Sequence, residues 1–155
     1  MNKIKTKIID RFIEEYSFLS NFYPSTIVVE NKFYKTVEHA YQALKSEDND
    51  VREIIRLAET PGKAKRLGRC VALRDGWDDM RENVMYDLLQ KKFDNPFLSE
   101  KLLHTENAEL VEGNNWNDTF FGVCRGVGQN ILGKLLMKVR SELREKRREN
   151  LWNID

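Results

Sequence analysis

The sequence contains only two cysteines and two histidines among its 155 residues. Cys70 and Cys124 form no C-x-x-C pair or other ligand spacing, so a zinc site is not expected. One disulfide between them is an alternative, but free thiols in a reducing cytosol are the favoured interpretation. The composition therefore predicts a site without a metal ion.

Long apolar runs and an excess of one charge are also missing. No window approaches a membrane span, and the opening MNKIKTKIIDRF lacks the apolar stretch of a signal peptide. The net charge is +1, so no global field draws the chain to nucleic acid or to a membrane. We expect a cytoplasmic protein with no membrane partner, in which any anion site is a local arrangement. The sequence does not indicate an oligomeric state.

The three prolines are spread out and no Gly/Ser-rich linker interrupts the chain, which favours one domain over residues 1–155. The first third has the short β-type patterns. Lys5–Phe12 and Ser17–Phe22 are strand candidates, and TIVVENKFYKT predicts a hairpin that turns at Glu30–Asn31–Lys32.

From Val37 onward the apolar period becomes helical, with Thr36 as the expected N-cap of the first helix. Thr60 before Pro61, and Asn95 before Pro96, predict two further helix starts. Apolar positions predict the other helices near 51–58, 77–93 and 131–143, the last ending in a solvated charge run, RSELREKRREN. The predicted fold class is α+β, a single compact helix-dominated domain with a small N-terminal β-rich region.

Polar side chains accompany the apolar stripe of the first helix. Helical spacing puts Glu38, Gln42 and Lys45 on one side, next to the stripe. A solvated acid in the first helical turn would also explain Glu38, because it favours the helix dipole. His39 points about 100° away and is expected to be a hydrogen-bonded structural residue.

The stretch FLSNFYP places Ser20 and Asn21 beside Phe22 and Tyr23. It is typical either of a turn closed by Pro24 or of a shelf on which a base or sugar stacks. Both interpretations stay open on the pattern alone.

Two further patterns have a structural and a functional explanation. The basic segment Lys63–Arg69, which includes Arg69, follows a helix start, so it is either a phosphate site or a solvated basic face. Trp77, Arg81 and Met85 recur every four residues, as in a core edge or in a stacked Arg–Trp wall.

The stretch LVEGNNWNDTFFG combines acids, amides and aromatic rings. Glu112, Asn114, Trp116 and Asp118 suit cleavage of a sugar C–N bond, in which a carboxylate offsets an oxocarbenium-like charge and activates water. Aromatic walls would hold the base, and amides would bind ribose hydroxyls. A tight Asx-turn loop with Trp116 as a core anchor explains half of the same pattern.

Taken together, FLSNFYP, YKTVEHAYQALK, ETPGKAKRLGR, W-x-x-x-R-x-x-V-M, KF-x-NP-x-L, LVEGNNWNDTFFG and G-x-N-x-LGKLLM-x-VR closely resemble the NADAR or YbiA-like family in order and spacing. NADAR abbreviates NAD- and ADP-ribose-associated. The resemblance runs from about residue 10 to residue 143.

The resemblance implies a YbiA-like α+β fold and an N-glycosidase that uses no metal or redox cofactor. Members are described as hydrolysing phosphorylated ribosylaminopyrimidines of riboflavin synthesis, and others as removing ADP-ribose from guanine. It implies a catalytic role for Glu38 and a functional one for Lys45, and binding or catalytic roles for Glu112, Asn114, Trp116 and Asp118. Phe121 stands where members often carry Trp, which bears on how the base stacks.

The resulting hypothesis gives each group a role. Glu38 orients or deprotonates water, or acts as an acid if it is neutral, and Asp118 binds ribose hydroxyls or shares the acid–base role. Trp116, Phe22 and Tyr23 stack on the base, and Lys45 and Arg69 hold phosphate. Nucleic acid would enter only as an ADP-ribosylated substrate. The alternatives are a non-catalytic ADP-ribose or NAD-binding module and a structural adaptor.

Overall fold

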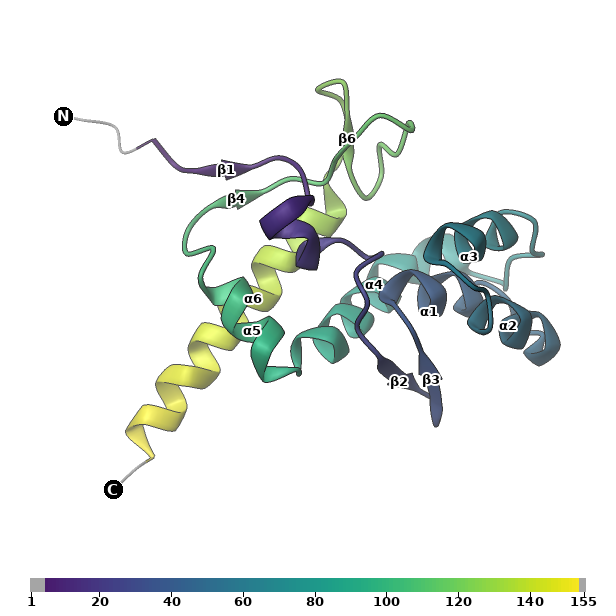
Figure 1. Ribbon diagram of the computed structural model, residues 1–155, viewed down its shortest axis with the longest axis horizontal. Coiled ribbons are helices and arrows are strands. Elements are labelled where there is room, and N and C mark those ends of the chain that lie inside the picture. Colours follow the sequence, from purple (N-terminus) through teal and green to yellow (C-terminus); the bar gives the residue numbers. More distant parts are fainter. Residues whose placement is uncertain (1–4, 154–155) are drawn as a thin grey trace. The chain divides into compact units, whose positions relative to one another are not determined.

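The computed structural model describes residues 5–153 and divides the chain into two compact units (Figure 1). The first unit contains the chain up to Ser20 and the chain from Phe93 onward, and the second runs from Asn21 to Lys92. The assignment of residues 1–155 to one domain stays a prediction, and residues 1–4 and 154–155 lie outside the described residues.

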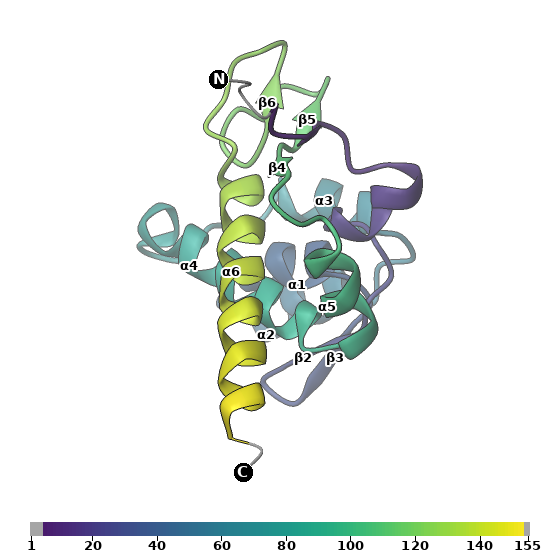
Figure 2. The same ribbon diagram turned by 90° about the vertical axis from the view of Figure 1, so that its left-hand side faces the viewer.

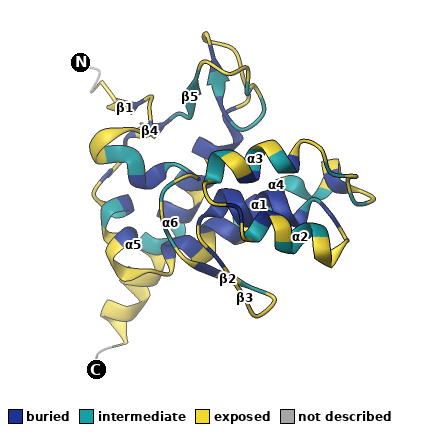
Figure 3. Cartoon of the chain, turned by 45° about the vertical axis from the view of Figure 1, so that its right-hand side comes forward, coloured by how far each residue is buried: buried dark blue, intermediate teal, exposed yellow. Residues whose placement is uncertain are grey.

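The second unit is a hairpin followed by helices that pack around α1. Its elements are β2 (Ile27–Val29), β3 (Lys32–Tyr34), α1 (Val37–Leu44), α2 (Asn49–Arg56), α3 (Pro61–Gly68) and α4 (Trp77–Phe93), whose last residue belongs to the first unit. Helix α1 packs against both α2 and α3. Helix α1 is buried along its whole length and is dark blue in Figure 3, whereas α2 and α3 each have an exposed face.

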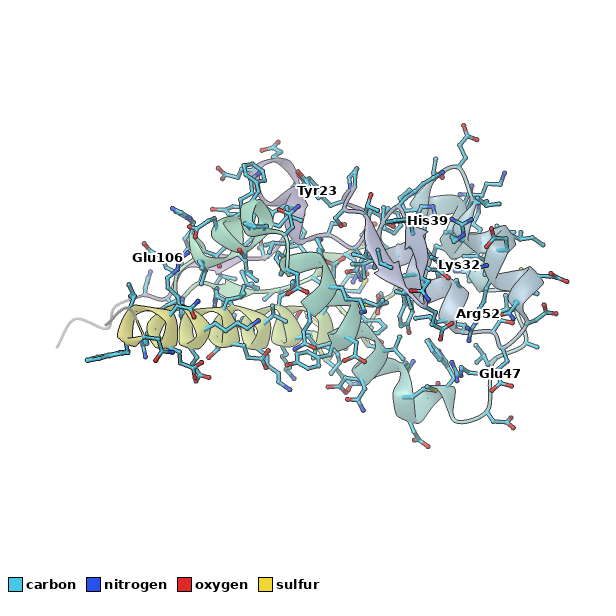
Figure 4. The ribbon with its side chains drawn as sticks, turned by 90° about the horizontal axis from the view of Figure 1, so that it is seen from below. Tyr23, Lys32, His39, Glu47, Arg52 and Glu106 are labelled. Atoms are coloured by element: carbon cyan, nitrogen blue, oxygen red, sulfur yellow. The ribbon has the colours of Figure 1, made fainter. Side chains whose placement is uncertain are left out.

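The predicted hairpin is confirmed. Ile27 pairs with Tyr34 and Val29 with Lys32, so the turn falls on Glu30 and Asn31. Both turn residues have positive φ, 50° and 62°, which is the geometry of a type I′ turn. Ion pairs from this turn to α2 join Lys32 to Glu53 at 3.0 Å and Glu30 to Arg52 at 3.1 Å; Lys32 and Arg52 are labelled in Figure 4.

The first unit is built on the long helix α6 (Ile131–Trp152), which packs against α5 (Pro96–Leu103) and β4 (Glu109–Leu110), as Figure 2 shows. Strand β4 pairs in parallel with β1 (Ile8–Ile9), and β5 (Gly113–Asn114) pairs in parallel with β6 (Val123–Cys124). The apolar face of α6 is buried over its first half, and its charged end is largely exposed, as the sequence predicts.

The strand predicted over Ser17–Phe22 is wrong. A 3₁₀ helix, η1 (Glu14–Leu19), occupies the first half of this stretch and buries the neighbours Phe18 and Leu19 together, and a bend and turn follow. Neighbouring residues of a strand point to opposite faces, so a strand with one buried face could not do this. The strand predicted over Lys5–Phe12 shortens to Ile8–Ile9, because its partner β4 offers only two residues. The α+β class with dominant helices is confirmed.

Candidate active site

Helix α1 is the structural centre of the candidate site in the second unit. Its N-cap is Thr36, as predicted, whose hydroxyl accepts a hydrogen bond from His39 N. All eight residues of the helix are buried. The prediction of one apolar stripe is therefore too narrow, because α1 also carries polar side chains into the core.

His39 is a structural residue, as the sequence predicts. Its Nδ1 lies 2.8 Å from Thr36 Oγ1 and its Nε2 lies 3.0 Å from the carbonyl oxygen of Ala58. Burial lowers the pKa of His39 below its ordinary value of 6.5. Both ring nitrogens are thus engaged: Nδ1 contacts the N-cap of α1, and Nε2 fixes α1 to the segment after α2.

Glu38 is 6% exposed, so the explanation of a solvated acid is wrong. Its backbone N–H donates to the carbonyl oxygen of Asn21 at 3.1 Å. Its Oε1 accepts a hydrogen bond of 2.7 Å from Nε2 of Gln42, one turn further along α1. A carboxylate on a buried helix is costly unless it is hydrogen-bonded.

The cation Lys45 lies within electrostatic range of this carboxylate. Burial lowers the pKa of Lys45 below its ordinary 10.5, and the charge of Glu38 opposes that shift. Arg69, Lys65 and Arg81 act on Lys45 in the same direction as burial. These charges therefore lie within electrostatic range of Lys45. Because Arg66 and Arg69 are exposed, the choice between a phosphate site and a solvated basic face stays open.

A pair of aromatic rings lies beside Lys45. Lys45 Nζ lies 5.5 Å from the ring centroid of Tyr41, and the Tyr41 and Trp77 rings are 5.3 Å apart at an angle of 53°. Trp77 is buried. Arg81 Nε lies 3.9 Å from an Asp78 carboxylate oxygen. The choice between a core edge and a stacked Arg–Trp wall stays open.

The stretch after Ser20 is a turn. It is joined to α1 by the hydrogen bond from Glu38 N–H to the Asn21 carbonyl oxygen. Asn21 is buried, its Nδ2 donates to Met85 Sδ at 3.6 Å, and its Oδ1 has no hydrogen-bond partner among the described residues. Lys65 Nζ lies 5.9 Å from the Phe22 ring centroid, and Lys92 Nζ lies 5.7 Å from that of Tyr23. Ser20 belongs to the first unit, where its N–H donates to Ser17 O.

In the first unit, Asn114 and Asp118 organise the loop between β5 and β6. Asn114 Oδ1 accepts from the N–H groups of Trp116 and Asp118, and its Nδ2 donates to Asp118 O at 2.8 Å. Asp118 Oδ1 accepts from the N–H groups of Phe120 and Phe121 at 3.1 and 2.9 Å. The amide and acid content of this stretch therefore has a local structural use, as the Asx-turn interpretation requires.

Trp116 is 50% exposed, so the prediction of a core anchor is wrong. Phe120 and Phe121 instead pack edge to face, with centroids 4.8 Å apart. Glu112 is held at its backbone, where its N–H donates to Asn130 Oδ1 and its carbonyl accepts from Val123 N.

Three residues that matter here were not among the site residues predicted from the sequence, although Gly68 was expected to end its helix and Gln42 to lie on the side of Glu38. Gln42 bonds to Glu38, Gly68 lies against the Gln42 side chain, and buried Asn130 bridges Glu112 N and Leu110 O. The four-residue spacing from Glu38 was a signal for Gln42. The other two contacts join segments far apart in the sequence.

Residues 5–153 contain no group of three His, Cys, Asp or Glu side chains arranged to hold a metal ion. The same described stretch has no helix with the length and apolar character needed to cross a membrane. Cys70 is exposed and Cys124 is buried, and both are free thiols.

Replacing Lys45 by Met should increase the free energy of unfolding at pH 7. The lowered pKa means that protonated Lys45 costs the folded state more than the unfolded state at every pH below the folded pKa. This cost shrinks as the pH rises towards 10.5, so the advantage of Lys45→Met should be larger at pH 7 than at pH 10. Urea unfolding at both values measures it, with exposed Lys63→Met as control. An advantage that grows with pH would contradict this account.

Replacing Asp118 by Ala should destabilise the first unit by about 1–2 kcal/mol, because two backbone N–H groups lose their acceptor. Asp118→Asn keeps an oxygen at Oδ1 and should stay within about 0.5 kcal/mol of the wild type. Chemical denaturation measures both variants. Equal losses in the two variants would show that charge, not the turn geometry, is what stabilises the loop.

Comparison with known proteins identifies the family. The model of the NADAR domain matches residues 9–144. An N-glycosidase of Nostoc punctiforme is 40% identical over 138 residues, which are 84% of this chain and 88% of that protein. A riboflavin biosynthesis protein of Vibrio vulnificus is 39% identical over 142 residues, which are 89% of this chain and 38% of that protein.

A solved structure agrees with these relatives. The NMR structure of YbiA from Escherichia coli matches with a TM-score of 0.83 at 37% sequence identity, covering 94% of this chain and 90% of that chain. YbiA is named an N-glycosidase. The family and the fold that the sequence motifs indicated are thus confirmed, and the chain belongs to the NADAR domain family.

Proposed function

We propose that this chain is an N-glycosidase that hydrolyses the C1′–N bond of a phosphorylated ribosyl compound. The observation that supports this best is Glu38, a carboxylate buried on α1 with the cation Lys45 within electrostatic range. The names of the Nostoc and Escherichia relatives, both N-glycosidases, agree with it.

In the proposed mechanism the C1′–N bond breaks with its electrons leaving on nitrogen, and the ribose passes through an oxocarbenium-like cation. The ionised Glu38 offsets that charge and takes a proton from the water that attacks C1′. The proton is returned to the departing nitrogen. The products are the free amine of the base and a phosphorylated ribose, and no oxidant or reductant is consumed.

The cations supply the phosphate site in this proposal. Lys45 and Arg69 bind the phosphate, and Lys65 and Arg81 add positive charge within electrostatic range of Lys45. Holding a substrate by a group remote from the reacting bond provides binding energy that orients C1′ towards Glu38.

The turn after Ser20 supplies contacts to the base or sugar. Phe22 and Tyr23 are proposed to stack on the base, and half-exposed Phe22 has an accessible ring. The buried Oδ1 of Asn21 is an acceptor near the backbone of Glu38, suited to a ribose hydroxyl. Buried Trp77 supports Tyr41 in this proposal. The roles of Ser20, Glu112, Asn114, Trp116 and Asp118 in binding or catalysis stay predictions of the family resemblance.

Among substrates, we propose the ribosylaminopyrimidine phosphates of riboflavin synthesis first. The Vibrio relative is named a riboflavin biosynthesis protein. A net charge of +1 gives no broad electrostatic attraction to a nucleic acid, which places ADP-ribosylated guanine second. A module that only binds ADP-ribose is the alternative class, and recovery of intact ligand after binding would identify it.

Replacing Glu38 by Gln should lower turnover of a ribosylaminopyrimidine 5′-phosphate by about 10²- to 10⁴-fold, the usual contribution of a positioned acid–base group. The amide has nearly the same shape, so substrate affinity should stay within a few-fold. Release of ribose 5-phosphate is the measurement.

Glu47→Gln is the matched control, because Glu47 is an exposed acid shortly after α1 (Figure 4), and it should keep wild-type turnover. Full turnover by a folded Glu38→Gln protein would refute the proposed mechanism. A guanine-linked ADP-ribosyl oligonucleotide assayed in parallel decides between the two substrates.

A further inference from the structure

The side-chain amide of Gln42 is held in one orientation inside the second unit. Gln42 is 4% exposed, and its Nε2 donates to Glu38 Oε1 over 2.7 Å. An ionised carboxylate only accepts hydrogen bonds, so the amide must present its NH₂ group to Glu38. Its Oε1 then faces away, and this atom is buried without a hydrogen-bond partner among residues 5–153.

Gly68, the last residue of α3, lies against the same amide. A methyl group on Gly68 would lie 2.0 Å from Gln42 Oε1, 2.7 Å from Cδ and 2.9 Å from Cβ. A Cβ at position 68 would therefore require the Gln42 side chain to move, and glycine is the residue that leaves room for it. The amide is thus enclosed between the Glu38 carboxylate and the α3 backbone.

This arrangement is not the one that stability alone favours. A buried acceptor without a partner destabilises the folded state, and an apolar side chain of similar length would fill the same space without that cost. What Gln42 provides in return is the hydrogen bond to Glu38. Because Arg69 follows Gly68 directly, the residue that confines the amide is also next to a cation of the proposed phosphate site.

We propose that Gln42, confined by Gly68, is the positioning residue for Glu38. Its N–H fixes one carboxylate oxygen and stabilises the ionised form, so that Glu38 meets C1′ in a single rotamer. Gln42 itself touches neither ribose nor phosphate in this role. The proposal rests on the proposed function, because it assumes that Glu38 is the reacting carboxylate.

Gln42→Met is the direct test, because Met has a similar volume and lacks both the donor and the buried acceptor. We expect a folded protein with kcat lowered about 10- to 100-fold, KM within about threefold of the wild type, and the acidic limb of the pH–kcat profile shifted to higher pH. The shift follows because the ionised carboxylate loses its hydrogen bond.

Gly68→Ala tests the positioning of Glu38 by Gln42 from the side of α3, where Gly68 confines the amide. It should lower kcat as Gln42→Met does, and the double variant should be no worse than Gln42→Met alone, since both changes act through one amide. Gly62→Ala is the control on the same helix, because a methyl group there would make only ordinary contacts, 3.8 Å to Arg66 and 3.9 Å to Thr60. It should keep wild-type kcat.

Unchanged kcat and pH profile in Gln42→Met would overturn the proposal, and so would a raised KM with unchanged kcat, which would make Gln42 a substrate-binding residue. A second readout does not need turnover: the pH titration of the carbon-13-labelled Glu38 carboxyl by NMR. Its midpoint should rise in Gln42→Met, and an unmoved midpoint overturns the proposal. A wild-type protein without turnover but with this rise would refute only the proposed function.

Discussion

Burial of α1 on every side is the constraint on which the second unit depends. A helix buried all round is normally apolar all round, but α1 has Glu38, His39 and Gln42 among its residues. Each of these side chains is therefore hydrogen-bonded inside the unit. His39 bonds to Thr36 and lies within hydrogen-bond distance of the Ala58 carbonyl, whereas Glu38 and Gln42 bond to each other.

The His39 contacts and the Glu38–Gln42 hydrogen bond have different consequences for the protein. The His39 contacts fix α1 to its surroundings and leave a neutral ring with no chemistry to perform. The Glu38–Gln42 contact keeps a carboxylate in a poorly solvated place, with Lys45 also partly desolvated nearby. Burying charges in this way seldom adds stability. Two costly groups of opposite charge in one small region are more readily explained by a reaction than by folding.

In the loop between β5 and β6, by contrast, the polar side chains are explained by local structure. Its asparagines and Asp118 suggested a sugar-binding surface, yet the hydrogen bonds of the Asn114 and Asp118 side chains run largely to the backbone of the same loop. Asn130, from the start of α6, completes this framework through Glu112 and Leu110. A polar composition alone therefore does not separate a structural loop from a binding loop.

Much of the fold followed from local chemistry. The caps at Thr36, Thr60 and Asn95 form as predicted. In each cap a side-chain oxygen accepts a hydrogen bond from a backbone N–H two or three residues further along the chain, so no distant segment is needed. The hairpin also forms as predicted, although Glu30 and Asn31 replace the preferred turn residues. Motif order identified the family, which single residues could not.

The features that could not be predicted from the sequence depend on packing between distant segments. The 3₁₀ helix η1 arises because Phe18 and Leu19 are both buried, which no local pattern specifies. The depth of Glu38 and the exposure of Trp116 are likewise set by neighbours. The Gln42–Gly68 contact joins α1 to α3, which lie 26 residues apart at this point, so no local pattern specifies it. For the candidate site, the sequence named Glu38, but its environment came from the structure.

The most direct test of the central claim is a crystal structure of the Glu38→Gln protein with intact ribosylaminopyrimidine 5′-phosphate bound. The account predicts that the phosphate contacts Lys45 and Arg69, and that a water lies between the side chain at position 38 and C1′, about 3–3.5 Å from each. A substrate bound with C1′ far from this side chain would contradict the claim that Glu38 performs the hydrolysis.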